Sequence, residues 1–263
     1  YKWGCDWGLK WYEQRFGKRA PLIGEDGRYG SGPGWSEGLY CPVGKGCWYK
    51  GRVLWTYTGT FSDITKGYAA AKPMYEQGAV AVYNIAGPLG LGINQAVQEI
   101  ASEKKLQSGP PYWIGVDANQ DWINPGFIIA SMMKRVDRGV YYATLLTVIG
   151  KFKEVVAEYN GVLTLGVGTR VGRLEMEGIS VSTLEDLNEF IQMGVNAEKL
   201  TGRKVLPMPP EEIRKNVAEM RNKLPSWVWD ALTELESKIR SGQVEVPMVL
   251  TKDAVDSWRE LLG

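Results

Sequence analysis

The sequence predicts an α/β fold in which a mainly parallel sheet is flanked by helices. Short apolar runs alternate with helical segments between residues 52 and 116, and glycine-containing turns separate them. Hydrophobic residues make up 44% of the 263 residues and charged residues 23%. A chain of this length and composition buries a core without help from a metal or a disulfide.

The strand–helix alternation runs through the first half of the chain. Ser62 or Asp63 caps the first of its helices and Gly78 ends it. The expected elements are strands at 52–61, 79–86 and 112–116, helices at 63–77 and 93–105, and a tight loop, GPLGLG, at 87–92. Right-handed crossovers between such units give parallel strands whose carboxyl ends share one edge of the sheet.

The second half of the chain is richer in helices. Residues 127–149 contain a short extended piece and a helix that carries Lys134, Arg135 and Asp137. A β-rich region with glycine turns follows at 161–182. The remaining expected elements are helices at 183–193, 211–224 and 226–241 and an amphipathic tail at 248–263.

Charge and composition exclude several classes of function. The chain has 31 basic and 30 acidic side chains, whereas a nucleic-acid-binding protein needs a basic surplus, so we expect no nucleic-acid partner. It has no histidine, which excludes serine–histidine and cysteine–histidine catalysis and histidine-ligated zinc or haem. Hydrolytic chemistry would therefore have to rest on carboxylates or lysine. A hydrolase using Asp117 and Asp121 is the enzymatic alternative, although no paired-acid motif of known spacing supports it.

A long glycine-rich surface excursion is expected at 24–51. It contains Cys41 and Cys47 in the loop CPVGKGC, where either a disulfide or two reduced thiols fit the spacing. No apolar stretch of the sequence is long enough to span a membrane, and we expect no leader peptide because the opening residues lack a basic-then-apolar pattern. Residues 1–16 have the pattern of a helix that lacks an N-cap or a preceding turn, so we expect the chain to be a processed product or a fragment.

Three residues near the expected strand ends are candidate ligand contacts. Gly87 begins the GPLGLG loop, whose backbone N–H groups either face a polar ligand or form a plain strand-to-helix turn. Asp117 ends the third strand, and its carboxylate either accepts hydrogen bonds from a sugar diol or forms a turn. Asn119, Gln120 and Asp121 follow it as further polar groups. Lys134 either donates to a ligand or is solvated on its helix.

Three segments together resemble the basic membrane protein family of nucleoside-binding lipoproteins, which feed ABC importers. They are NIAGPLGLGINQA, IGVDANQDWINPG and ASMMKRVDRGVYYA, in this order. The family pattern has a glycine loop, a GVDxDQ strand end and a SxxKRVD helix. TGTFSDITKGYAAAKPMYEQGA and IRSGQVEVP are also similar to family segments, so the resemblance covers about residues 52–247.

The resemblance implies a type I periplasmic-binding-protein fold, in which two α/β lobes clamp a purine nucleoside. In this chain Asp117 would bind the ribose hydroxyls, Gly87 would offer its backbone and Lys134 would reach the ligand. The implied partners are the ligand, an ABC transporter permease, and a missing N-terminal lobe or other copies of the chain. The implied location is the cell surface, with a membrane anchor outside this chain. Neither catalysis nor a cofactor is implied.

The implied domain organisation follows the same family. Residues 1–124 form the C-terminal-lobe unit with an insertion at 21–51, and 125–158 are a hinge-crossing strand and helix. Residues 159–247 return to the lobe, and the tail at 248–263 follows.

Some features depart from the family pattern: most of the N-terminal lobe is lacking, Pro88 replaces a glycine and Asn119 replaces an acid. A cell-surface structural or assembly protein that reuses the fold is therefore the rival hypothesis.

Overall fold

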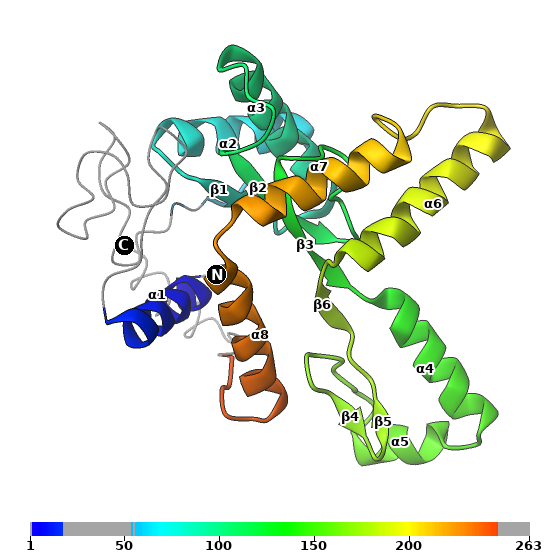
Figure 1. Ribbon diagram of the computed structural model, residues 1–263. Helices are drawn as coiled ribbons and strands as arrows, with labels where there is room; N and C mark the ends of the chain where they lie inside the picture. Colours follow the sequence, from blue (N-terminus) through cyan, green and yellow to red (C-terminus); the bar gives the residue numbers. More distant parts are fainter. Residues whose placement is uncertain (1, 18–53, 55, 247–263) are drawn as a thin grey trace.

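The computed structural model describes residues 2–17, 54 and 56–246 (Figure 1). The expected insertion at 21–51, its cysteines Cys41 and Cys47, and the expected tail at 248–263 lie outside the described residues. The main sheet of the described part is mixed and has helices on both faces, so the predicted α/β fold is confirmed.

The sheet has four strands in the order β1-β2-β3-β6. The strands β1 (Ala81–Tyr83), β2 (Tyr112–Asp117) and β3 (Ile128–Lys134) are parallel, as the strand–helix alternation predicts. The fourth, β6 (Ile179–Val181), pairs antiparallel with β3. The sheet is therefore mostly parallel with one antiparallel edge.

Two helices cover each face of the sheet. One face carries α2 (Ile64–Glu76) and α3 (Gly90–Glu103), and the other carries α6 (Leu184–Thr201) and α7 (Pro210–Lys223). Successive residues of a strand face opposite sides of the sheet, so neighbouring residues of one strand belong to different cores. Trp113 belongs to the core under α2 and α3, and its neighbour Tyr112 to the core under α6 and α7.

Local capping explains where several helices begin and end. Asp63 caps α2, and its Oδ1 accepts from the Lys66 N–H at 3.1 Å. Thr183 and Asp186 form a reciprocal capping box at the start of α6. Gly202 ends α6 in the left-handed conformation, with φ of 65°. The helix continues beyond the predicted 183–193 through Gly194, where a Cβ would lie 2.5 Å from Leu206 Cδ2, so this glycine allows close packing instead of ending the helix.

A smaller unit projects from the end of β3 (Figure 1). It consists of α4 (Val136–Val148), α5 (Phe152–Glu158) and a hairpin of β4 (Arg170–Val171) and β5 (Leu174–Glu175). This unit has its own buried cluster, made of Leu146, Val155, Val171 and Met176. The β-rich character expected for 161–182 is confirmed, although its strands are only two or three residues long.

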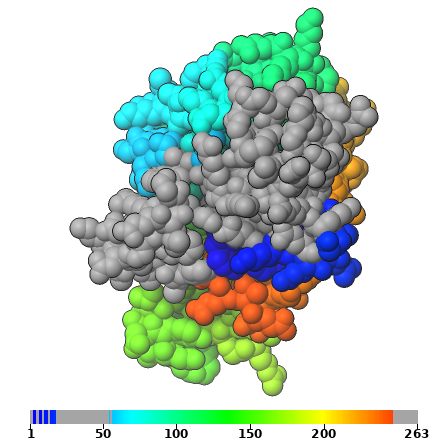
Figure 2. Space-filling view, turned by 90° about the vertical axis from the view of Figure 1, so that its left-hand side faces the viewer, coloured from blue at the N-terminus to red at the C-terminus, as the bar shows by residue number. Residues whose placement is uncertain are grey.

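The helices α1 (Lys2–Phe16) and α8 (Ser226–Arg240) pack together, as Figure 2 shows. The Trp11 indole N–H donates to Glu234 at 2.7 Å, and the ring centroids of Tyr12 and Trp227 are 4.7 Å apart. None of the helices in the described ranges is both long and apolar enough to cross a membrane.

Two expectations about local structure were wrong. Of the strand expected at 52–61, the described residues 54 and 56–61 form no strand. Lys134 is the last residue of β3 rather than part of a helix, because β3 extends through its pairing with β6. Arg135 lies between strand and helix, and only Asp137 lies on α4.

Candidate functional site

The carboxyl ends of β1, β2 and β3 meet at one edge of the sheet. Asp117 lies beside Met133 in the parallel register, one residue before Lys134. The end of β1, Tyr83, lies beside Ile114 on the other side of β2. In open parallel sheets, ligands bind at this edge.

A buried asparagine shapes the loop that carries Gly87. Asn84 Nδ2 donates to the Gly87 carbonyl at 2.9 Å, and Asn84 Oδ1 accepts from the Ala86 N–H at 3.0 Å. Gly87 has φ of 20°. A Cβ at this position would lie 3.9 Å from Asp117 Oδ2 and 3.9 Å from the Phe61 carbonyl oxygen. The structure thus brings Gly87 and Asp117 together, as predicted.

The other glycines of GPLGLG serve packing. A Cβ at Gly90 would lie 2.5 Å from Asn84 Nδ2, and one at Gly92 would lie 2.0 Å from the Ile64 carbonyl oxygen. Both approaches are closer than real Cβ atoms allow, so α3 reaches its neighbours only without these side chains. The motif therefore combines a half-buried glycine beside Asp117 with close packing at the start of α3.

Asp117 presents its carboxylate at the strand end. Its φ of 68° lies in the left-handed region, which aspartate tolerates better than most residues. The turn is closed by a hydrogen bond from the Ala118 N–H to the Val116 carbonyl at 2.9 Å. Asp117 is exposed, and among the described residues its carboxylate has no hydrogen-bond or ion-pair partner. This carboxylate is free to accept hydrogen bonds from a ligand.

Lys134 is exposed at the end of the adjacent strand. Its backbone pairs with Ile179 of β6, which fixes the strand end, and its ammonium group forms no ion pair within the described ranges. The structure therefore places Lys134 on the same edge as Asp117. It shows no contact of the Lys134 side chain with Gly87 or Asp117.

The polar residues after Asp117 are not available to a ligand. Asn119 is 1% exposed, and Asp121 is 0% exposed. Asp121 Oδ2 accepts from Arg221 Nη2 at 2.8 Å. Burial raises the pKa of Asp121, and the charge of Arg221 opposes this rise. The expectation of an extended polar cluster was therefore wrong for Asn119 and Asp121, and the carboxylate pair required by the hydrolase alternative is not formed at the surface.

Two aromatic residues near Asp117 were missed by the sequence analysis. Burial raises the pKa of the half-buried Tyr83, and the negative charge of Asp117 raises it further. Phe61 is 76% exposed, and its carbonyl oxygen accepts from the Leu89 N–H at 3.3 Å, which places it beside the Gly87 loop. The exposed position of Phe61 was not predicted, because the apolar pattern of 52–61 predicts a strand. Its position just before the Asp63 cap is the signal that was available.

A hollow of about 450 Å³ lies elsewhere, between the end of α6 and the start of α7. Its lining residue Glu198 accepts from the Val205 and Leu206 N–H groups at 2.8 and 2.9 Å. This carboxylate is therefore used to hold the loop between α6 and α7. No cluster of three or more potential metal ligands occurs in the portion of the chain that the structure describes.

Comparisons with known proteins agree with the motifs and the fold. The family described as ABC transporter substrate-binding protein PnrA-like (Bmp) matches residues 50–196, which is more than half of the chain. An uncharacterized lipoprotein of Pyrococcus abyssi is 34% identical over 73% of this chain and 43% of its own length. Basic membrane protein D of Borreliella burgdorferi is 33% identical over 35% of this chain and 25% of its own length.

A solved structure is similar as well. The crystal structure of ABC transporter system solute-binding proteins from Aeropyrum pernix K1 has a TM-score of 0.64 and 28% identity, covering 97% of this chain and 65% of that chain. The chain spans less than half the length of the lipoprotein relatives from Pyrococcus. The family resemblance of the motifs is confirmed. The chain belongs to the PnrA-like family of ABC transporter substrate-binding proteins.

Proposed function

We propose that the protein is the extracytoplasmic solute-binding component of an ABC importer and binds a purine nucleoside or a similar ligand without catalysis. The observation that carries this proposal is the convergence of Asp117, whose carboxylate has no partner among the described residues, with the half-buried Gly87 at the carboxyl edge of a parallel sheet. Two adjacent sugar hydroxyls are donors that suit one carboxylate.

The surroundings of Asp117 support a ligand with a flat ring as well as hydroxyl groups. Phe61 is 76% exposed and its carbonyl oxygen lies beside the Gly87 loop, and aromatic rings such as its own stack on planar heterocycles. Lys134, one strand away, supplies a positive donor for an acceptor atom of the ligand. A nucleoside combines all three features in one molecule.

The projecting unit supports the proposed division into lobes, in which residues 125–158 cross toward a second lobe. The helix α4 buries only Leu146, whereas Val136, Val140 and Val148 are 61%, 64% and 78% exposed. The first two are one helical turn apart, and Val148 lies two turns further along the same face. An apolar face of this kind is typical of a surface that another domain covers. We propose that this domain is the lobe that completes the clamp and that a permease docks on the closed protein.

The proposed location follows from the relatives. Three relatives from Pyrococcus are described as lipoproteins, and others as basic membrane proteins. We propose that this protein likewise works at the cell surface and is held there by an anchor.

Calorimetric titration of the full chain with adenosine, guanosine and inosine tests the ligand. We expect heat of binding with at least one nucleoside, and its loss in Asp117→Asn, which keeps the shape but removes the charge. Asp230→Asn, an exposed change on α8, is the matched control and is expected to bind like the wild type. No heat with any of the three nucleosides contradicts the proposal.

The second candidate is a cell-surface assembly protein that reuses the fold. The exposed apolar face of α4 favours it, since the same surface suits contacts between copies. Light scattering distinguishes the two candidates. A stable oligomer that binds no nucleoside supports assembly, and a strict monomer at working concentration excludes it.

A further inference from the structure

We propose that Arg221 is a positioning residue that holds the Asp117 turn and the end of β3 in the geometry that the ligand requires. The inference rests on the proposed function and goes beyond it, because Arg221 lies on α7, far from Asp117 in sequence and outside all three family motifs.

Arg221 is the centre of a buried polar network. Its Nη2 donates to Asp121 Oδ2 at 2.8 Å and to Ser182 Oγ at 3.2 Å. Its Nε donates to the Ile129 carbonyl of β3 at 3.0 Å. The second oxygen of Asp121 accepts from Ser131 Oγ at 2.7 Å. One guanidinium therefore joins α7 to the loop after β2, to β3 and to the segment after β6.

The network reaches Asp117 through two further hydrogen bonds. The Gln120 N–H donates to Ser131 Oγ at 2.9 Å, and Gln120 Oε1 accepts from the Val116 N–H at 2.9 Å. Val116 directly precedes Asp117. A Cβ at Gly115 would lie 2.5 Å from Ser131 Oγ and 2.8 Å from Gln120 Oε1, so β2 leaves room for this arrangement. Asp117 thus adopts its left-handed conformation in a turn whose flanking residues, Val116 and Ala118, are both held by hydrogen bonds.

The same network holds the strand that ends at Lys134. The Ser131 N–H donates to Ser182 Oγ at 2.8 Å, and the Ser182 N–H donates to the Ser131 carbonyl at 2.8 Å. Ser131 is three residues before Lys134 on β3. The two strand ends that present the candidate ligand contacts are therefore fixed relative to each other by one buried cluster.

The cost of burial favours a positioning role over a purely stabilising one. Moving two charges out of water costs about as much as their attraction returns, and apolar replacements of similar volume are often as stable. Such a pair does have one effect that apolar packing lacks: its directed hydrogen bonds specify a single arrangement of the groups around it. Here the specified groups are the backbone on either side of Asp117.

Hydrogen exchange and nucleoside binding of Arg221→Met test the proposal. We expect the Val116 and Gln120 amides to exchange about tenfold faster in this variant, because their acceptors lose the network that holds them. We expect inosine, or the best-bound nucleoside of the panel, to bind about tenfold more weakly, the order seen when a supporting contact of a ligating group is lost.

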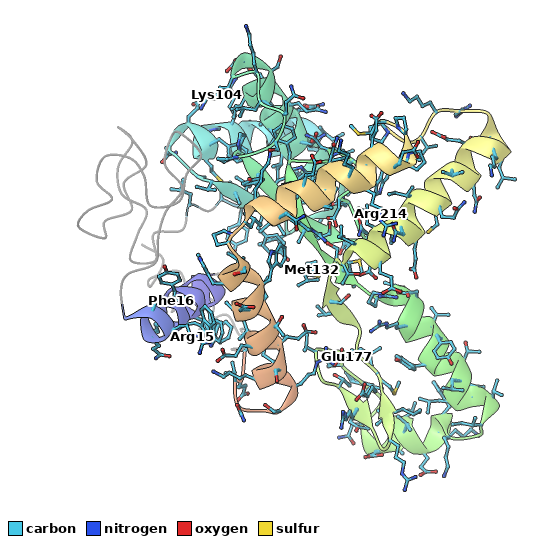
Figure 3. All side chains as sticks on the ribbon, viewed as in Figure 1. Arg15, Phe16, Lys104, Met132, Glu177 and Arg214 are labelled. Atoms are coloured by element: carbon cyan, nitrogen blue, oxygen red, sulfur yellow. The ribbon has the colours of Figure 1, made fainter. Side chains whose placement is uncertain are left out.

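Two control variants on the same helix separate positioning from stability. Met220→Ala removes a fully buried side chain from the core beneath α7, and Arg214→Met removes an exposed guanidinium (Figure 3). Both are expected to keep slow exchange at Val116 and Gln120 and the wild-type affinity, even where Met220→Ala lowers the melting temperature as much as Arg221→Met.

The double variant Asp121→Asn with Arg221→Met covers the case in which Arg221→Met does not fold, since it leaves no unpaired buried charge. It is expected to recover stability but not slow exchange or affinity. Unchanged exchange at both amides, or unchanged affinity despite faster exchange, overturns the proposal. If the wild type binds no nucleoside, the proposed function fails by itself, while the exchange rates still decide whether Arg221 holds the Asp117 turn.

Discussion

The role of Gly87 is tested by adding one methyl group in Gly87→Ala. A side chain at φ of 20° is strained, and left-handed conformations cost L-residues about 1–2 kcal/mol. The new Cβ would have its nearest neighbours, Asp117 Oδ2 and the Phe61 carbonyl oxygen, at 3.9 Å, which is ordinary contact. The free energy of unfolding is therefore expected to fall by about 1–2 kcal/mol from strain alone, and the melting temperature by about 2–4 °C per kcal/mol.

Ligand affinity is expected to fall further than stability explains. The methyl group would lie 3.9 Å from both Asp117 Oδ2 and the Phe61 carbonyl oxygen, at the position that the proposed function assigns to the ligand. Loss of one ligand hydrogen bond, about 1.5 kcal/mol, weakens binding about tenfold. Nucleoside titration and thermal unfolding measure the two effects separately.

Gly150→Ala is the matched control for Gly87→Ala. Gly150 has φ of 72°, and a Cβ added there would meet no described atom within 4 Å. It follows α4, away from the edge that holds Asp117. It is expected to lose similar stability and no affinity. Equal affinity of Gly87→Ala and Gly150→Ala would refute the placement of the ligand against Gly87.

Three further predictions concern stability and are checked by denaturant or thermal unfolding. Gly92→Ala is expected to lower the free energy of unfolding by about 3 kcal/mol, because its Cβ would lie 2.0 Å from the Ile64 carbonyl oxygen. Gly139→Ala, inside α4, is expected to raise the free energy of unfolding by about 0.5–1 kcal/mol, because its Cβ would meet only Leu165 Cδ1 at 3.7 Å, an ordinary contact. Equal effects of the two changes would contradict this. Thr183→Ala is expected to cost about 1 kcal/mol through loss of the capping box, and no loss would show that the cap is redundant. Two accepted backbone N–H hydrogen bonds lower the pKa of Glu198 from 4.5, so its contribution to the free energy of unfolding is present above pH 4.5 and is lost as the pH falls through the lowered pKa. Glu198→Gln is therefore expected to be less stable than the wild type at neutral pH, and this difference in stability is expected to shrink in acid. A difference that does not change with pH would contradict the prediction.

Much of the fold follows from local sequence patterns. Alternation of apolar runs and helical segments predicts parallel strands, because crossover connections of that length return the chain in the same direction. Asp63, one of the two caps predicted for the first helix, begins α2, and α6 starts at the predicted position after Thr183, since capping depends only on residues within one turn. The strand that ends at Asp117 was found in the same way. These features are decided within about fifteen residues of chain.

The candidate site is only partly visible in the sequence. Gly87 and Asp117 follow successive strands, and the shared edge of a parallel sheet brings them together. Phe61 was hidden because an apolar run becomes a strand only if another strand pairs with it, and residues 56–61 have none. Lys134 ends a strand instead of starting a helix because β6, more than forty residues later, pairs beside it.

Tertiary structure alone decided which polar residues remain available to a ligand. Asp117 and Asp121 are the same residue type and lie only four positions apart in the sequence. Asp121 is buried because α7 brings Arg221 against it across 100 residues of chain, while nothing described packs over the Asp117 carboxylate. Local pattern sets which elements form, but burial and charge pairing depend on which distant elements pack together, and these determine the chemistry of each carboxylate.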